Sequence, residues 1–166
     1  MTFWNSLKKP FFVVAPMADV TDPAFRRMIA KYSAHKRSDG TIGGPDVMWT
    51  EFVSADGLAR APEEGRKKLM ADLIYGEEER PIVAQLFSSN PLYMEQAAHL
   101  CRELGFDGVD INMGCPDNSI EKQGAGAAHI KSHEHAVEVI RAAMEGAGHH
   151  AGGIPVSVKT RLGYNT

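Results

Sequence analysis

Five short apolar segments recur along the chain, separated by stretches with helical spacing. The predicted strands are Phe11–Ala15, Val47–Phe52, Pro81–Phe87, a segment around Val109 and Ile111, and Ile154–Arg161. Parallel strands need long crossover connections, usually helices, so this alternation favours a parallel sheet. The pattern predicts an α/β fold, either a (β/α)8 TIM barrel or a doubly wound sheet. The glycines of residues 124–127 lie too far past their strand to form a dinucleotide-binding turn, which favours the barrel.

Capping residues and prolines mark the expected helices. They are a helix that begins at Pro23 after Asp22 or Thr21, residues 56–70 with a break near Pro62, Pro91–Leu104 capped by Asn90, and His133–Met144 capped by Ser132. In the first helix one face is apolar, with Phe25, Met28 and Ile29. Its basic residues are expected on a solvated face, namely Arg26, Arg27 and Lys31.

Polar residues interrupt the apolar strands near their carboxyl ends, where parallel folds place reacting groups. Gln85 lies inside an apolar strand and needs hydrogen-bond partners there, so it is either part of a structural network or a ligand contact. Asn112 alternates with Val109 and Ile111 and therefore points to the other face. Lys159 lies in a strand expected to be buried, where its charge needs an anion or a polar ligand. We expect these side chains to converge at one end of the sheet.

Cys115 follows the fourth predicted strand, between Gly114 and Pro116. A cysteine at this place can be an acid, a nucleophile, a metal ligand or simply a buried residue. The metal alternative is disfavoured, since neither the local spacing nor Cys101 supplies a partner ligand. Cys101 itself lies on the apolar face of its helix and is predicted to be a core residue.

Composition limits the remaining classes of function. The 166 residues carry a net charge of −3, so a basic nucleic-acid footprint would have to be a local patch. Two cysteines in unrelated contexts favour a reducing compartment. The sequence has no apolar run of membrane-spanning length and no export signal, so we expect a cytoplasmic protein. The histidines suggest no metal site, because they lack a convincing partner set.

Five motifs occur in an order that closely resembles the tRNA-dihydrouridine synthases. They are residues 15–22 (APMADVTD), 50–55 (TEFVSA), 83–87 (VAQLF), 110–116 (DINMGCP) and 158–161 (VKTR). The resemblance implies an FMN-binding TIM barrel followed by a smaller helical domain. Residues 1–166 would then be the N-terminal portion of the catalytic barrel, with about five βα units. The remaining barrel strands and the C-terminal helical tRNA-binding domain would lie outside them.

The resemblance also implies a reaction and its residues. NADPH or NADH would reduce FMN, which would then deliver hydride to C6 of a flipped-out uridine in tRNA. Cys115 would protonate C5 as the general acid, a task that suits a thiol because it is mostly protonated near neutral pH yet labile. Pro16, Met17 and Ala18 would line the isoalloxazine, and Gln85 and Lys159 would bind its pyrimidine edge. Asn112 and Arg161 would contact the uridine or its flanking phosphate.

Two departures from the family pattern are visible. Asp19 stands where the family usually has glycine, and the loop of residues 33–45 is longer than usual. Two other functions stay open at this point. One is an FMN-dependent barrel oxidoreductase acting on a free pyrimidine, similar to dihydroorotate dehydrogenase. The other is a truncated, non-catalytic product that does not hold the flavin.

Overall fold

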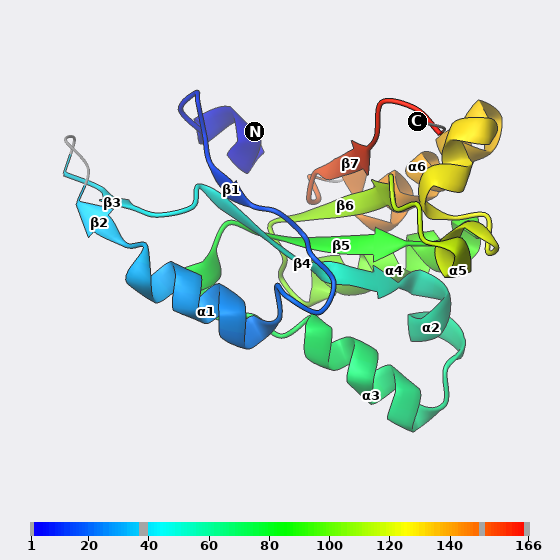
Figure 1. The fold of residues 1–166 in the computed structure, drawn as a ribbon, viewed down its shortest axis with the longest axis horizontal. Coiled ribbons are helices and arrows are strands. Elements are labelled where there is room, and N and C mark those ends of the chain that lie inside the picture. Colours follow the sequence, from blue (N-terminus) through cyan, green and yellow to red (C-terminus); the bar gives the residue numbers. More distant parts are fainter. Residues whose placement is uncertain (1, 37–39, 150–151, 165–166) are drawn as a thin grey trace.

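The computed structural model describes residues 2–36, 40–149 and 152–164, and its centre is a five-stranded parallel sheet (Figure 1). The strands lie in the order β1 (Val13–Val14), β4 (Val47–Ser54), β5 (Ile82–Phe87), β6 (Gly108–Met113) and β7 (Val156–Thr160). This spatial order is the chain order, without the reversal that defines a doubly wound sheet. The sheet is therefore a curled part of a TIM barrel, and the barrel prediction is confirmed.

The helices are α1 (Pro23–Tyr32), α2 (Ala55–Arg60), α3 (Glu63–Asp72), α4 (Pro91–Glu103), α5 (Asn118–Glu121) and α6 (His133–Gly146). Three 3₁₀ helices join them: η1 (Phe3–Ser6), η2 (Glu77–Glu79) and η3 (Gly126–Lys131). The side chain of Asp22 accepts the Phe25 N–H at 2.7 Å, and that of Asn90 accepts the Leu92 N–H at 3.0 Å, so both predicted caps are confirmed. Ser132 precedes α6, but its side chain makes no capping hydrogen bond.

The two faces of the sheet are covered differently. Outward residues of β5 and β6, such as Leu86 and Ile111, pack with Met94 of α4 and Val139 of α6 in the main core. Cys101 is fully buried in this core, as predicted, and burial raises the pKa of its thiol to about 12.

Near the amino ends of the strands, the inner face carries a second apolar cluster. It contains Val47, Trp49 and Val83, with Phe3, Trp4 and Leu7 packed against them. The segment that includes η1 thus covers this end of the inner face, because Phe3, Trp4 and Leu7 pack against the first residues of the strands there. Within the described residues, no helix combines the length and apolar character needed to cross a lipid bilayer.

The first predicted strand is largely wrong. The structure has only Val13–Val14 as β1, and Phe12 is 73% exposed although a buried strand was expected. Within the described residues β1 lies at an edge of the sheet and pairs with β4 alone, so no strand covers its other side. The long loop also differs from expectation, because it holds a short antiparallel pair, β2 (His35–Lys36) and β3 (Ile42–Gly43). Residues 37–39 of this loop lie outside the described part.

The expected solvated face of α1 is wrong at one position. Arg26 is completely buried, whereas its neighbour Arg27 is exposed, as the pattern predicts. On the predicted apolar face of the same helix, Met28 is 56% exposed. Helical periodicity identified the helix, but long-range partners decide which of its side chains are buried.

Candidate functional site at the carboxyl ends of the strands

A row of hydrogen-bonded polar side chains crosses the inner face of the sheet. Gln85 of β5 donates from Nε2 to Asp110 Oδ2 of β6 at 2.6 Å, and Ser157 of β7 donates to Asp110 Oδ1 at 2.6 Å. Asn112 donates from Nδ2 to Gln85 Oε1 at 3.3 Å. These residues face one another because Gln85 pairs with Asp110, and Asp110 with Ser157, in the parallel register. The row therefore connects three adjacent strands.

An irregularity in β4 extends this row. The register between β4 and β5 shifts between Trp49 and Phe52. In the shifted region the Gln85 N–H donates to the Thr50 hydroxyl at 3.0 Å. The buried amide thus keeps a partner through a side chain, as buried backbone donors require. Both the backbone and the side chain of Gln85 are consequently fixed.

Asn112 joins the row to the loop that carries Cys115. Its Oδ1 accepts the N–H of Cys115 at 3.0 Å and that of Gly114 at 3.2 Å. The Cys115 carbonyl accepts the N–H of Ala127 at 2.9 Å. Cys115 is half-buried and packs against an apolar cluster at the carboxyl ends of the strands. Its backbone is therefore held on both sides while its side chain stays partly accessible.

Gly126 supports this loop by leaving room for it. A side chain at Gly126 would bring its Cβ to 2.6 Å from the Cys115 carbonyl oxygen, and the residue has a left-handed φ of +60°. Both constraints require glycine, because a Cβ would clash and L-residues rarely adopt this conformation. The glycine-rich segment after Cys115 thus shapes the loop of the cysteine.

The residues predicted to line a flavin, Pro16, Met17 and Ala18, form the loop after β1. The Thr21 hydroxyl accepts the Met17 N–H at 3.0 Å and donates to the Met17 carbonyl at 3.1 Å. Asp19 follows with φ of +58°, a left-handed conformation that favours glycine. Its N–H donates to Glu51 Oε2 at 2.8 Å. The loop is thus tied to β4 and to the start of α1.

Lys159 and Arg161 belong to the other edge of the sheet. Lys159 is the register partner of Asn112 on β7, but it is exposed, so the expectation of a buried lysine is wrong. Within the described residues β7 pairs with β6 alone, so its other edge has no neighbouring strand. Arg161 directly follows β7 and is half-buried. The structure therefore joins Gln85, Asn112 and Cys115 by hydrogen bonds, and carries Lys159 next to Asn112 in register.

Burial is the largest influence on the pKa of three carboxyls, those of Asp110, Glu51 and Asp72. It raises the pKa of the Asp110 carboxyl, while hydrogen bonds from Ser157 and Gln85 and the charge of Lys159 lower it again. Burial also raises the pKa of Glu51 and of Asp72, and the negative charge of Asp19 adds to both shifts. The carboxylate of Asp19 thus repels those of Glu51 and Asp72 beside the loop after β1.

Sequence reasoning left Asp110, Ser157 and Thr50 without a role. The alternation of residues 109–112 placed Asp110 on the inner face, but its two partners lie 25 and 47 residues away. His129 was also underestimated, because it is buried and its Nε2 hydrogen-bonds the Ser88 carbonyl at 3.1 Å. The described residues contain no group of three His, Cys, Asp or Glu side chains arranged to hold a metal ion.

Comparison with known proteins adds an independent observation. A family model described as dihydrouridine synthase (Dus) matches residues 13–166. A probable tRNA-dihydrouridine synthase 2 of Bacillus subtilis (strain 168) is 40% identical over 162 residues, which are 98% of this chain and 44% of that protein. Probable tRNA-dihydrouridine synthases of Staphylococcus epidermidis (strain ATCC 35984) and Staphylococcus aureus (strain COL) are each 37% identical over the same shares. The chain thus spans less than half the length of these relatives.

Proposed function

The chain belongs to the dihydrouridine synthase family, and from this membership we propose that it carries much of the active site of an enzyme that reduces uridine in tRNA to 5,6-dihydrouridine. FMN is the proposed cofactor, in keeping with the family, and NADPH or NADH the proposed reductant. The chain covers 44% of its relatives' length, so activity with tRNA is proposed for a complete barrel.

The side chains at the carboxyl ends of the strands fit a flavin. The pyrimidine edge of a flavin presents hydrogen-bond donors and acceptors. The buried Gln85 amide, which already bonds Asp110 and Asn112, would offer that edge its second N–H and the second lone pair of its oxygen. Lys159 would add a cation that balances negative charge on that edge. Pro16, Met17 and Ala18 would provide an apolar loop beside the ring, since Met17 is 41% exposed. When bound, FMN would supply the hydride that is added to C6 of the uracil ring.

The chain's own residues would complete the reduction of the C5=C6 bond. The Cys115 thiol would donate its proton to C5, on the face of the ring opposite to the incoming hydride. Asn112 would keep the Cys115 loop in place through its bonds to the two loop amides. Arg161 would contact the uridine or a flanking phosphate, where the guanidinium fork matches an anionic oxygen pair.

One observation carries the proposal. A continuous hydrogen-bonded path runs from Gln85 through Asn112 to the backbone of Cys115. It connects a proposed cofactor residue, a proposed substrate residue and the proposed acid across two neighbouring strands. Such mutual fixation is what a preorganised site needs, because small displacements of the reacting groups reduce the rate strongly.

Flavin binding is the first test. The purified 166-residue chain is mixed with FMN, passed through a desalting column and examined for visible absorbance. We expect a retained flavin spectrum, with weaker retention for Gln85→Leu and unchanged retention for Lys67→Met, on the exposed face of α3. A chain that is folded by circular dichroism but retains no flavin would contradict the proposed cofactor site of this chain.

The acid is tested by supplying the rest of the barrel. The chain is co-expressed with the remaining part of the Bacillus subtilis relative, and dihydrouridine formation is measured on tRNA that lacks the modification. Cys115→Ala should retain flavin and lose nearly all product, whereas Cys101→Ala should retain product. Full activity of Cys115→Ala would exclude the acid role. Reduction of a free pyrimidine without reduction of tRNA would instead support the dihydroorotate dehydrogenase-like alternative.

A further inference from the structure

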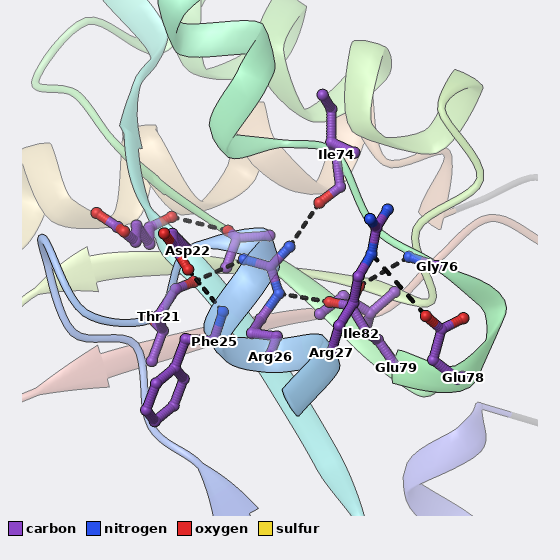
Figure 2. A network of polar contacts seen from close by, with 12 residues as sticks. Thr21, Asp22, Phe25, Arg26, Arg27, Ile74, Gly76, Glu78, Glu79 and Ile82 are labelled. Carbon is purple, nitrogen blue, oxygen red and sulfur yellow. Dashed lines mark hydrogen bonds and ion pairs between the residues drawn. The ribbon is translucent and has the colours of Figure 1, made fainter. Parts of the chain in front are cut away.

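A completely buried arginine lies beneath the loop after β1. Arg26 belongs to the second turn of α1, and its side chain has an exposed fraction of 0%. Its Nε donates to Glu79 Oε2, its Nη1 to the Thr21 carbonyl and its Nη2 to the Ile74 carbonyl, each at 2.6 Å. Figure 2 shows these three acceptors around the guanidinium, on three separate segments of the chain. One side chain of α1 therefore binds the loop before that helix, the segment after α3, and η2.

The buried partner of Arg26 is itself fully satisfied. Glu79 has an exposed side-chain fraction of 0%, and its Oε1 accepts the Gly76 N–H at 2.8 Å. Arg27 lies farther away, with its Nε 3.7 Å from Glu79 Oε1 (Figure 2). The ion pair thus combines short distances with hydrogen bonds to the remaining polar atoms, which is the condition for a buried pair to offset its desolvation.

Stability alone does not require this pair. Buried ion pairs can often be replaced by well-packed apolar side chains without loss of stability. The guanidinium adds a geometric constraint that apolar side chains lack, because its planar N–H groups fix the positions of the acceptors around it. The acceptor that bears on the site is the Thr21 carbonyl, since Thr21 connects Arg26 to the loop of Met17.

Thr21 transmits this fixed position to Met17. It is completely buried, and its hydroxyl bonds both the N–H and the carbonyl of Met17. Its own N–H also donates to the Met17 carbonyl at 3.0 Å. All of the backbone polar groups of Met17 are therefore held by the residue that Arg26 holds.

We propose that Arg26 is a positioning residue for the cofactor loop: with Glu79 it fixes Thr21, and Thr21 fixes the backbone of Met17 in the shape that receives the flavin. The inference rests on the proposed function for the identity of the ligand. Arg26 acts through Thr21 and not by touching the flavin. The order that it imposes on the loop exists before any ligand binds, so it is measurable in the flavin-free chain.

The test compares two changes that interrupt the path at different points. The double variant Arg26→Met/Glu79→Leu replaces both charges by apolar groups, so no buried charge is left unpaired. Thr21→Val leaves the ion pair and removes only the hydroxyl, and Thr21→Ser keeps the hydroxyl as its matched control. Hydrogen exchange of the Met17 and Thr21 amides is measured without flavin, with the amides of α4 as the internal reference. FMN affinity is measured in parallel.

In both Arg26→Met/Glu79→Leu and Thr21→Val, we expect the Met17 amide to exchange about tenfold faster and FMN to bind about tenfold more weakly. This is the effect expected from the loss of one or two hydrogen bonds. Thr21→Ser should resemble the unaltered chain in both measurements. Unchanged exchange at Met17 in Arg26→Met/Glu79→Leu or in Thr21→Val, or an increase shared equally by α4, would overturn the proposal. If the unaltered chain binds no FMN, the proposed cofactor site fails, while the exchange data still decide the role of Arg26.

Discussion

Replacing Asp19 by glycine should stabilise the chain. Asp19 has a φ of +58°, and a left-handed conformation costs an L-residue about 1–2 kcal/mol, somewhat less for aspartate. Glycine avoids this cost but adds freedom to the unfolded chain, which leaves a gain of about 0.5–1 kcal/mol. Removal of the charge beside Glu51 and Asp72 adds a few tenths of a kcal/mol, as is usual for partly exposed charges. The sum is about 1 kcal/mol, or about 2–4 °C in the unfolding midpoint.

Two further variants separate the backbone contribution from the charge. Asp19→Asn removes the charge and keeps a side chain that tolerates this conformation, whereas Asp19→Ala removes the charge and keeps the full backbone cost. Thermal unfolding followed by circular dichroism at pH 7 should rank the midpoints Gly, Asn, Asp, Ala, from highest to lowest. If the alanine variant were as stable as the glycine variant, the reasoning from the backbone conformation would be refuted.

The charge contribution has a defined dependence on pH. The folded-state pKa values of Glu51 and Asp72 are raised, mainly by burial, so their contribution to stability is lost as the pH rises through those values. Asp19 strengthens this loss while the carboxyls are ionised. The advantage of Asp19→Asn should therefore be present at pH 7 and small near pH 4. It should also shrink in 0.5 M salt, which screens exposed charges.

Two other predictions concern the surroundings of Cys115 and the buried histidine. Gly126→Ala should lower the free energy of unfolding by about 2–4 kcal/mol, because a Cβ would meet the Cys115 carbonyl. Gly40→Ala, also at positive φ but with no atom of the described residues within 4 Å of the added Cβ, should cost only about 1–2 kcal/mol; equal losses in denaturant titrations would argue against the contact. Burial lowers the pKa of His129, so its neutral form stabilises the fold above about pH 6.5, and this contribution is lost as the pH falls further. The unfolding midpoint should therefore fall less between pH 8 and 5.5 in His129→Gln than in the unaltered chain, and parallel curves would contradict this.

The sequence predicted best the strands that are covered on both faces. Residues 82–87 are apolar except for Gln85, follow a proline and form a strand buried on both faces, so local composition and tertiary environment agree. The run of Phe11 and Phe12 has similar composition, yet it lies at an edge where little packs against it. Composition reports which residues can be buried, whereas the position of a strand in the sheet decides which of them are.

Polar partners were harder to predict for a related reason. Arg26 lies outside the apolar stripe of its helix and was expected in solvent, but its carboxylate partner lies 53 residues away in a run of three glutamates. Nothing local distinguishes Glu79 from its two exposed neighbours. The inner-face position of Asn112 followed from alternation, while its bond to the Cys115 loop depends on the turn that Gly114 begins.

The aromatic segment before β1 has a practical consequence for spectroscopy. Trp4 and Trp49 are the chain's two tryptophans, and their rings lie 5.9 Å apart in the cluster that closes the amino ends of the strands. Intrinsic tryptophan fluorescence therefore reports on detachment of η1 from the sheet and is insensitive to loop motions at the opposite end. A fluorescence change that precedes the loss of circular dichroism would record the release of this segment from an otherwise folded sheet.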